Sequence, residues 1–236
     1  MRTLLLTLPL LAACGEGTWI ATTWGEDYIE QGIPASEFAD GCWVEFSAFE
    51  VQITEAALLD GDGEVVGDAG VGRFELTEPG PQELGRADVA AKTYATARFR
   101  IAPTDGPSVR AAGTLSCGED QAVGFDWAFS TDTTYVCEPT DLTLAAGGEG
   151  TTELTVHGDH LFYDGLEDPD ASVRGQAILD ADGDADGEVT LQELGSVSVA
   201  GLGYTVGSAS EVEDLAAFVE HLTTTVGHVD GEGHCQ

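Results

Sequence analysis

Residues 42–53 read Cys-Trp-Val-Glu-Phe-Ser-Ala-Phe-Glu-Val-Gln-Ile, a run dominated by aromatic and β-branched residues. In its second half, Phe49, Val51 and Ile53 alternate with polar residues. That two-residue period is typical of a β-strand with one buried face. The run therefore predicts one long strand that begins at Cys42.

The same period returns further along the chain, interrupted by turn residues. Residues 58–66 surround a glycine-rich turn and predict a hairpin. Further alternating segments cover residues 95–101, 109–115, 125–129, 135–137, 142–144 and 154–156. Short strands with turns between them favour a mainly β fold, and we expect an antiparallel β-sandwich over residues 41–157.

After the sandwich the period becomes helical. Residues 169–179 predict a helix with a proline in its first turn. Residues 210–226 predict a second helix with one apolar stripe, where Ser210 and Glu213 form a capping box. We expect residues 158–236 to form a helical segment that carries an EF-hand-like loop and packs on the sandwich.

Residues 182–193 read Asp-Gly-Asp-Ala-Asp-Gly-Glu-Val-Thr-Leu-Gln-Glu, in the register of an EF-hand calcium loop. Such a loop needs side-chain oxygens at positions 1, 3 and 5, glycine at 6, a backbone carbonyl at 7 and a bidentate Glu at 12. The predicted ligands are Asp182, Asp184, Asp186, the Glu188 carbonyl, Thr190 through water, and Glu193. An all-oxygen set of this size favours calcium over magnesium.

The surrounding sequence limits the role of this loop. A register that starts at Asp180 fails, because Ala185 and Leu191 then stand where glycine and Glu are required. The helix after the loop ends before Gly195, and the chain has no second matching loop, so the helix pair of a sensor is missing. We expect mainly structural calcium, bound with a dissociation constant of about 10⁻⁴ to 10⁻³ M. The alternative is a solvated acidic loop.

The charge balance excludes some partners. The chain has 8 Lys plus Arg against 43 Asp plus Glu, for a formal net charge of -35. Such a surface repels phosphate, so nucleic acid is excluded as a partner and cations are favoured. Solubility accounts for most of this acidity, because a specific ion site uses only a few carboxylates.

The N-terminus has the pattern of a targeting segment. Residues 1–13 have a positive start and an apolar run that is shorter than the roughly 20 residues of a membrane span, which predicts a signal peptide. Leu-Ala-Ala-Cys, ending at Cys14, resembles the lipobox of bacterial lipoproteins, which implies lipidation of Cys14. We therefore expect a protein of the bacterial cell envelope that meets the membrane only through its lipid, with Glu16 favouring the outer membrane. Residues 14–40 then form a tether whose aromatic residues pack in part on the body. An ordinary secretory peptide is the alternative.

Four other cysteines remain, an even set that predicts two disulfides in an exported protein, with three possible pairings. We favour Cys117–Cys137, because both lie at the ends of strands expected to be neighbours. That choice leaves Cys42–Cys235. The alternative is that Cys235 is a metal ligand beside His234.

The histidines form two groups. His157 and His160 flank Asp159, and His228 and His234 follow the second predicted helix. Pairs of His beside flexible glycines can converge on zinc or copper, with Asp159 or Asp164 as an oxygen ligand or an outer partner. The alternative is that these side chains only satisfy local hydrogen bonds. Three ligands and a water would permit hydrolysis, but no HExxH, Gly-x-Ser-x-Gly, P-loop or dinucleotide motif is present, so we do not expect an enzyme.

Taken together, these motifs resemble a group of uncharacterised bacterial lipoproteins. The resemblance rests on the lipobox, the strand-rich middle, His-x-Asp-His-Leu-Phe-Tyr-Asp at residues 157–164 and the single EF-hand-type loop. Gly-Ile-Pro-Ala at residues 32–35 and Gly-Glu-Gly-His-Cys at residues 231–235 extend it over most of the chain. It implies no established activity.

The sequence therefore predicts a lipid-anchored, calcium-binding protein of the cell envelope that can hold a second, His-based transition metal. A structural or interaction module without a transition metal is one alternative. A metal-dependent hydrolase is the other.

Overall fold

The computed structural model describes residues 15–119, 121–138, 140, 142–231 and 235. The expected signal peptide, Cys14 and His234 lie outside these residues. The described chain is mainly β, and most of its short helices lie toward the C-terminus. None of its described helices is long and apolar enough to cross a membrane.

The predicted long strand organises the larger sheet. Strand β2 (Cys42–Leu59) pairs with β8 (Val109–Cys117) on one side and with β7 (Thr96–Ile101) on the other. The order of the main path is β10-β7-β2-β8-β9, and each of these pairs is antiparallel. The remaining strands of this sheet are β3 (Val65–Asp68), β4 (Gly72–Glu75), β9 (Gln121–Phe129) and β10 (Thr133–Cys137). The pairing of β2 with β3 confirms the hairpin expected around residue 61.

The smaller sheet contains a strand that the sequence analysis missed. Its order is β13-β12-β1-β5, with β1 (Glu16–Gly25) parallel to β12 (Glu149–Val156) and antiparallel to β5 (Gln82–Ala90). The tether expected at this point is therefore wrong for these residues, and the smaller sheet is mixed. Trp19 holds this strand against its neighbour, because its ring is fully buried and its indole nitrogen donates to Thr152 on β12 at 2.6 Å. Strand β13 covers Gly227–Val229, and β6 (Thr93–Tyr94) and β11 (Leu142–Thr143) form a separate pair.

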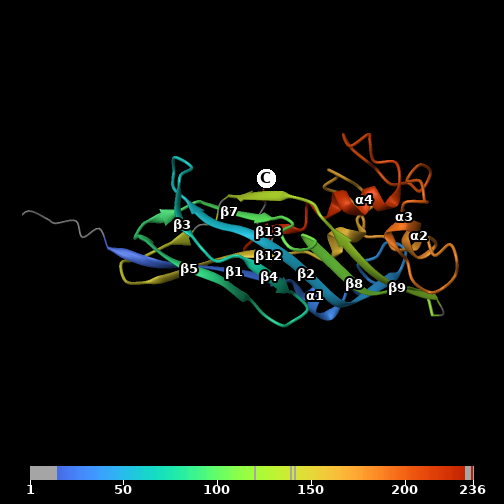
Figure 1. Cartoon of the computed structure of the whole chain (residues 1–236), viewed down its shortest axis with the longest axis horizontal. Coiled ribbons are helices and arrows are strands. Elements are labelled where there is room, and N and C mark those ends of the chain that lie inside the picture. Colours follow the sequence, from blue (N-terminus) through green and yellow to red (C-terminus); the bar gives the residue numbers. More distant parts are fainter. Residues whose placement is uncertain (1–14, 120, 139, 141, 232–234, 236) are drawn as a thin grey trace, which may run out of the picture.

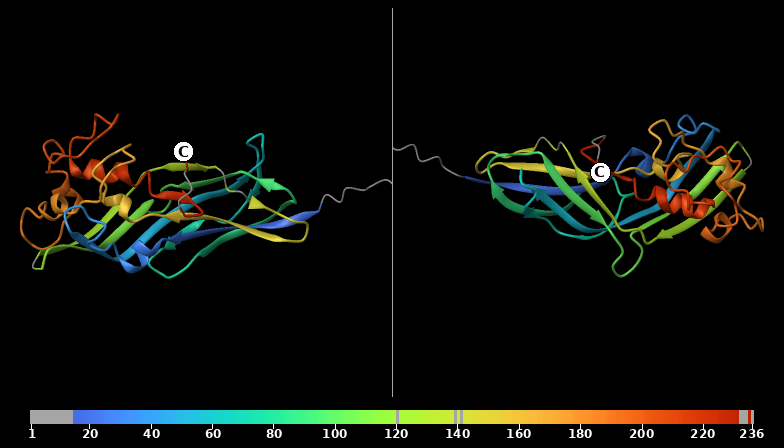
Figure 2. Two further views of the ribbon diagram at one scale, coloured as in Figure 1. Left: turned by 180° about the vertical axis from the view of Figure 1, so that it is seen from behind. Right: turned by 90° about the horizontal axis from the view of Figure 1, so that it is seen from above.

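The two sheets share one hydrophobic core in an elongated molecule (Figure 1, Figure 2). The start of β1 lies at one end of the long axis, and α2, α3 and α4 gather toward the other (Figure 1). The short helices are α1 (Asp27–Gln31), η1 (Asp159–Phe162), α2 (Gln176–Leu179), α3 (Leu191–Leu194) and α4 (Leu215–Leu222).

Both predicted helices are shorter than expected. Of residues 169–179 only the last turn, α2, is helical, because Val173 forms β-bridges to Phe38 and Tyr163. Helix α4 begins after Asp214, whose carboxylate accepts from the Ala217 N–H at 2.9 Å, so the expected capping box at Ser210 is wrong.

The residues directly before α4 are not helical, because their backbone groups are already paired. The Glu213 carbonyl accepts from Val199 N–H at 3.0 Å, and the Leu215 N–H donates to the Val197 carbonyl at 2.9 Å. A helix across this stretch would have to break both bonds.

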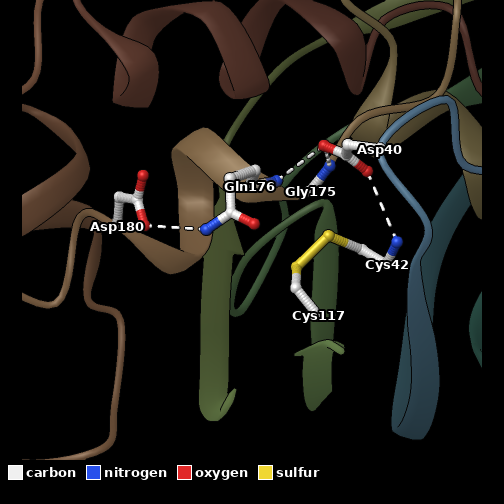
Figure 3. Close-up of a disulfide and its surroundings, with 6 residues drawn as sticks. All are labelled: Asp40, Cys42, Cys117, Gly175, Gln176 and Asp180. Carbon is white, nitrogen blue, oxygen red and sulfur yellow. Dashed lines mark hydrogen bonds between the residues drawn. A yellow bond between two sulfur atoms is a disulfide. The ribbon is translucent and has the colours of Figure 1, made fainter. Parts of the chain in front are cut away.

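The disulfides differ from the expected pairing. The structure contains Cys42–Cys117 and Cys137–Cys235. Cys42 and Cys117 face each other where β2 and β8 pair (Figure 3). Cys137 lies on β10, which is separated from β8 by β7 and β2, so strands consecutive in sequence are not neighbours in the sheet.

Near the Cys42–Cys117 disulfide, Asp40 links the start of β2 to the helical end. Its carboxylate accepts from the backbone N–H groups of Gly175 at 2.9 Å and Gln176 at 2.8 Å (Figure 3). These are the free donors at the start of α2, so Asp40 acts as an N-cap from a distant part of the chain.

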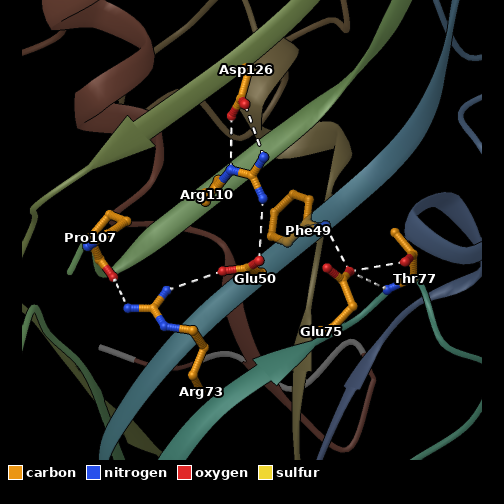
Figure 4. Close-up of polar contacts among 8 residues, drawn as sticks. All are labelled: Phe49, Glu50, Arg73, Glu75, Thr77, Pro107, Arg110 and Asp126. Atoms are coloured by element: carbon orange, nitrogen blue, oxygen red, sulfur yellow. Dashed lines mark hydrogen bonds and ion pairs between the residues drawn. The ribbon is translucent and has the colours of Figure 1, made fainter. Parts of the chain in front are cut away.

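Acidic partners neutralise the few positive charges. Glu50 on β2 pairs with Arg73 at 3.4 Å and with Arg110 at 3.2 Å, and Arg110 also meets Asp126 at 2.9 Å (Figure 4). The other described arginines also lie in ion pairs: Arg86, Arg98, Arg100 and Arg174. The excess of carboxylates over cations in the sequence therefore sets the charge of the surface.

Candidate metal centres

Three histidines from two segments meet in one cluster. His157 directly follows β12, His160 lies in η1, and His228 lies in β13, which pairs with β12. The ring centres are 5.4 Å apart for His157 and His160, 4.4 Å for His157 and His228, and 5.1 Å for His160 and His228. We call these three residues, with Asp159, the His cluster.

The spacing of the His cluster suits a metal ion. A ring bound through nitrogen at about 2.1 Å has its centre about 3.2 Å from the metal, so two bound rings at right or tetrahedral angles have centres roughly 4.5–5.2 Å apart. The observed separations of 4.4 to 5.4 Å span that range. In addition, one ligand atom each of His157, Asp159 and His160 lies within 4.8 Å of the others.

Hydrogen bonds fix the tautomer of His160. Its Nδ1 lies 3.0 Å from the Thr225 hydroxyl, and that hydroxyl donates its own proton to the Leu222 carbonyl at 2.9 Å. The hydroxyl oxygen must therefore accept from Nδ1–H, which leaves the lone pair of His160 on Nε2. Burial, helped by the charge of His157, lowers the pKa of His160 to about 3. The ring is thus a neutral ligand at physiological pH.

His157 differs from His160, because both of its ring nitrogens face acceptor oxygens. Its Nδ1 lies 3.4 Å from a carboxylate oxygen of Glu26, and its Nε2 lies 3.2 Å from the Gly231 carbonyl. Both neighbours offer acceptor oxygens, which favours the protonated form of the ring. Burial alone would lower the pKa of His157, but the hydrogen bond and charge of Glu26, together with Asp159, raise it above its usual value.

The two carboxyl groups beside His157 are also perturbed. Burial is the main cause that raises the pKa of Glu26 and of Asp159. One oxygen of Asp159 accepts from the Tyr163 hydroxyl at 3.0 Å. A hydrogen bond between the carboxyl groups of Glu26 and Asp159 adds to the rise in the pKa of Glu26 and opposes the rise in the pKa of Asp159. A cation bound beside Asp159 would replace this contact between two buried carboxyl groups.

A pocket of about 560 Å³ opens over the His cluster. Its other walls come from the end of β1, from α1, from the segment after η1 and from the end of α4. The lining residues are Glu26, Tyr28, Tyr163, Gly165, Leu166, Glu167, Asp168, Pro169, Ala171, Leu222 and Thr225, together with the His cluster.

Four of the five predicted transition-metal residues therefore come together, namely His157, Asp159, His160 and His228, whereas His234 lies outside the described residues. The sequence analysis missed Glu26. No motif marks this residue, and the segment containing it was expected to be a tether. Only the position of Glu26, directly after the segment that forms β1, could have indicated this residue.

The predicted calcium loop folds with its carboxylates turned inward. Asp182 accepts from the backbone N–H groups of Asp186 at 3.2 Å and Gly187 at 3.1 Å, and Glu193 accepts from Gly183 N–H at 3.2 Å. Ligand oxygens of Asp182, Asp184 and Glu193 lie within 4.8 Å of one another. Gly187 has φ +89°, which only glycine adopts without strain, as a sharp turn at position 6 requires.

Strand β9 supports this loop. Gly124 on β9 donates to the Gly187 carbonyl and accepts from Val189 N–H, both at 2.8 Å. Because Gly124 pairs with the residues on either side of Glu188, the Glu188 carbonyl points away from β9, toward the inside of the loop. The buried side chain of Val189 anchors the loop to the core.

Comparison with known proteins gives little information about this chain. No family model matches the sequence, and no curated protein matches it. Among solved structures, MbnP from Methylosinus trichosporium is similar over 93% of this chain and 98% of its own, with a TM-score of 0.38 and 10% sequence identity.

Proposed function

We propose that this protein binds a transition metal, zinc or copper(II), at the His cluster, and that calcium stabilises its helical end. The observation that carries the first part is that the ring centres of His157, His160 and His228 lie 4.4 to 5.4 Å apart, beside the buried Asp159, in the lining of one pocket. Imidazole nitrogen with one carboxylate oxygen is a ligand set typical of zinc and copper(II).

The protonation states of His160 and His157 determine what each ring must exchange when a metal binds. His160 offers a neutral nitrogen, whereas His157 must exchange its contact with Glu26 or Gly231 for the metal. A metal binds only the unprotonated nitrogen of an imidazole, so a raised pKa of His157 makes binding weaker as the pH falls. Glu26 or the Gly231 carbonyl then serves as the outer partner that holds the ring.

Calcium is the second candidate ligand, and the inward carboxylates of residues 182–193 together with the glycine turn at Gly187 favour it. The loop lies between α2 and α3 and is bound to β9, so an ion there would join the helical end to the larger sheet. Its role is structural.

The N-terminal sequence supports a lipid anchor at Cys14 in the bacterial cell envelope. In that arrangement the start of β1 faces the membrane. The helical end, at the other end of the long axis, then points away from it (Figure 1).

Metal analysis of protein purified without a His-tag tests the transition-metal site. We expect close to one zinc or copper(II) per chain after loading, and a loss of at least tenfold in affinity for His160→Ala. His221→Ala is the matched control, because His221 lies on α4 and does not line the pocket. Absence of zinc and copper uptake, or equal loss in both variants, would remove the site.

Calorimetry with calcium tests the loop. Glu193→Gln should abolish binding at millimolar calcium, because a bidentate carboxylate is lost. Glu188→Gln should leave the affinity within about threefold, because position 7 binds through its backbone carbonyl. Binding that survives Glu193→Gln would exclude an EF-hand-type site.

A further inference from the structure

The pocket over the His cluster is much larger than an ion needs. Its volume is about 560 Å³. A water molecule occupies about 30 Å³ of liquid, so an ion with one or two waters fills only a small part of it. Pockets of roughly 300–1,000 Å³ are typical of sites for small organic molecules.

The charge of the pocket selects the class of molecule. Four carboxylate groups line it, those of Glu26, Asp159, Glu167 and Asp168, and no Lys or Arg is among the described lining residues. A divalent ion at the His cluster would offset the charge of the two inner groups, Glu26 and Asp159, and would leave the exposed carboxylates of Glu167 and Asp168. An anionic or zwitterionic ligand is therefore disfavoured, and a cationic ligand is attracted.

The two outer carboxylates are fixed in place. Glu167 accepts from the Ser208 hydroxyl at 2.6 Å and from the Ser208 N–H at 3.1 Å, and its backbone has φ +59°, an uncommon value for a residue with a side chain. Asp168 accepts from the Asp170 N–H at 3.0 Å. Both side chains are held by the fold at the mouth of the pocket, which limits the entropy lost when a ligand binds.

The rest of the wall suits an organic body. Pro169 is exposed and Ala171 is half-buried, so these two residues supply apolar surface, whereas Leu166 and Leu222 lie beneath it at 2% exposure. Tyr28 and Tyr163 add aromatic rings. Apolar groups gain free energy on such a wall, and aromatic faces attract alkylated ammonium groups.

We infer that this pocket binds a small organic cation, an alkyl- or methyl-substituted ammonium compound, beside the metal. The inference rests on the proposed function, because the metal centre forms the inner end of the pocket. Carboxylates at the mouth recognise the charge, and the apolar and aromatic wall recognises the carbon groups around it.

Two probes of the same shape test the inference. Choline and 3,3-dimethyl-1-butanol differ in that a positively charged nitrogen replaces a neutral carbon. In calorimetry with the zinc-loaded full chain, we expect choline to bind at least tenfold more tightly, and its affinity to fall as salt rises. Equal affinities for the two probes, or no choline binding to protein that retains its zinc, would overturn the inference.

Substitutions at the mouth locate the site. Glu167→Gln keeps one of the two acceptor oxygens that Ser208 uses, and Asp168→Asn keeps an acceptor for the Asp170 N–H. Each should weaken choline binding at least threefold without loss of zinc. Asp170→Asn is the matched control, because Asp170 is exposed and does not line the pocket. Equal effects of all three substitutions would also overturn the inference.

A failure of the metal proposal gives a different result. Protein that takes up no zinc contradicts the proposed function. In that case the same probe pair, titrated into the metal-free chain, decides the inference alone: a preference for choline of at least tenfold supports it, and equal affinities overturn it.

Discussion

The indole nitrogen of Trp127 donates a hydrogen bond of 2.8 Å to the carbonyl oxygen of Val189. Trp127 belongs to β9 and Val189 to the candidate calcium loop, so one buried bond joins the larger sheet to the helical end. The ring of Trp127 also lies 6.3 Å from that of Phe162 in η1, the element that carries Asp159 and His160. Trp127 thus contacts the supports of both candidate metal sites.

Replacement of Trp127 by Phe should destabilise the protein. An aromatic ring remains in the Phe variant, but the Val189 carbonyl loses its buried hydrogen-bond donor, which costs about 1–3 kcal/mol. Denaturant unfolding in saturating calcium measures this loss. Trp43→Phe is the control, because Trp43 is partly exposed on β2, and a loss as large at Trp43 would contradict the role of the bond.

Asp40→Ala should uncap α2. Two backbone donors at the start of that helix lose their acceptor, for a loss of about 0.5–2 kcal/mol in the free energy of unfolding. Asp40→Asn keeps an oxygen in the same place and should recover most of the stability. If the Asn variant is no better than the Ala variant, the carboxylate acts through its charge and not as a cap.

Glu26→Gln should weaken the transition-metal site. The Glu26 carboxylate is 3.4 Å from His157, and removal of an outer partner of a metal-bound His typically costs about 10–100-fold in affinity. Competition with a chelator of known zinc affinity measures the change. Asp27→Asn tests the general effect of charge, because Asp27 is exposed on α1, and an equal loss there would show that Glu26 is not a specific partner.

The second disulfide should hold the His228 strand in place. Strand β13 pairs with β12, and Cys137–Cys235 ties down the chain that follows it. Replacement of both cysteines by Ser should lower the free energy of unfolding by about 2–4 kcal/mol and also weaken zinc binding. The pair Cys42→Ser and Cys117→Ser should affect stability without the loss of zinc affinity. Peptide mapping without reduction checks the pairing itself, and a Cys117–Cys137 peptide would contradict it.

Glu153 should give the stability of the metal-free protein a dependence on pH. Burial raises the pKa of Glu153 above its usual value of 4.5, with Asp230 adding to the effect and the Thr155 hydroxyl opposing it. The folded chain therefore binds this proton more tightly than the unfolded chain, so the contribution is full at low pH and is lost as the pH rises through the folded-state pKa. Glu153→Gln should be more stable relative to the natural chain at pH 7.5 than at pH 4. Unfolding curves at the two pH values decide this, and an unchanged difference would exclude it.

Much of the β structure was predictable because strand period is local. The alternation of Phe49, Val51 and Ile53 identifies β2 from its own residues, and the spacing of Asp182, Asp184 and Glu193 describes a loop whose oxygens do lie close together. In both cases the relevant partners are within a few residues of one another. Side-chain chemistry and short-range geometry are then sufficient.

Strand order and the composition of the pocket were decided only by the tertiary structure. The strand Glu16–Gly25 was not predicted, because the strands that it pairs with are far along the chain. Cys42 bonds to Cys117 because β2 lies between β7 and β8 in the larger sheet, and so next to the strand that carries Cys117. The same long-range pairing brings Glu26 beside His157 at adjacent ends of β1 and β12, where the carboxylate lies against the ring. A sequence specifies which segments can form strands. Which strands become neighbours depends on the burial of the whole core, and these neighbours determine the surroundings of the His cluster.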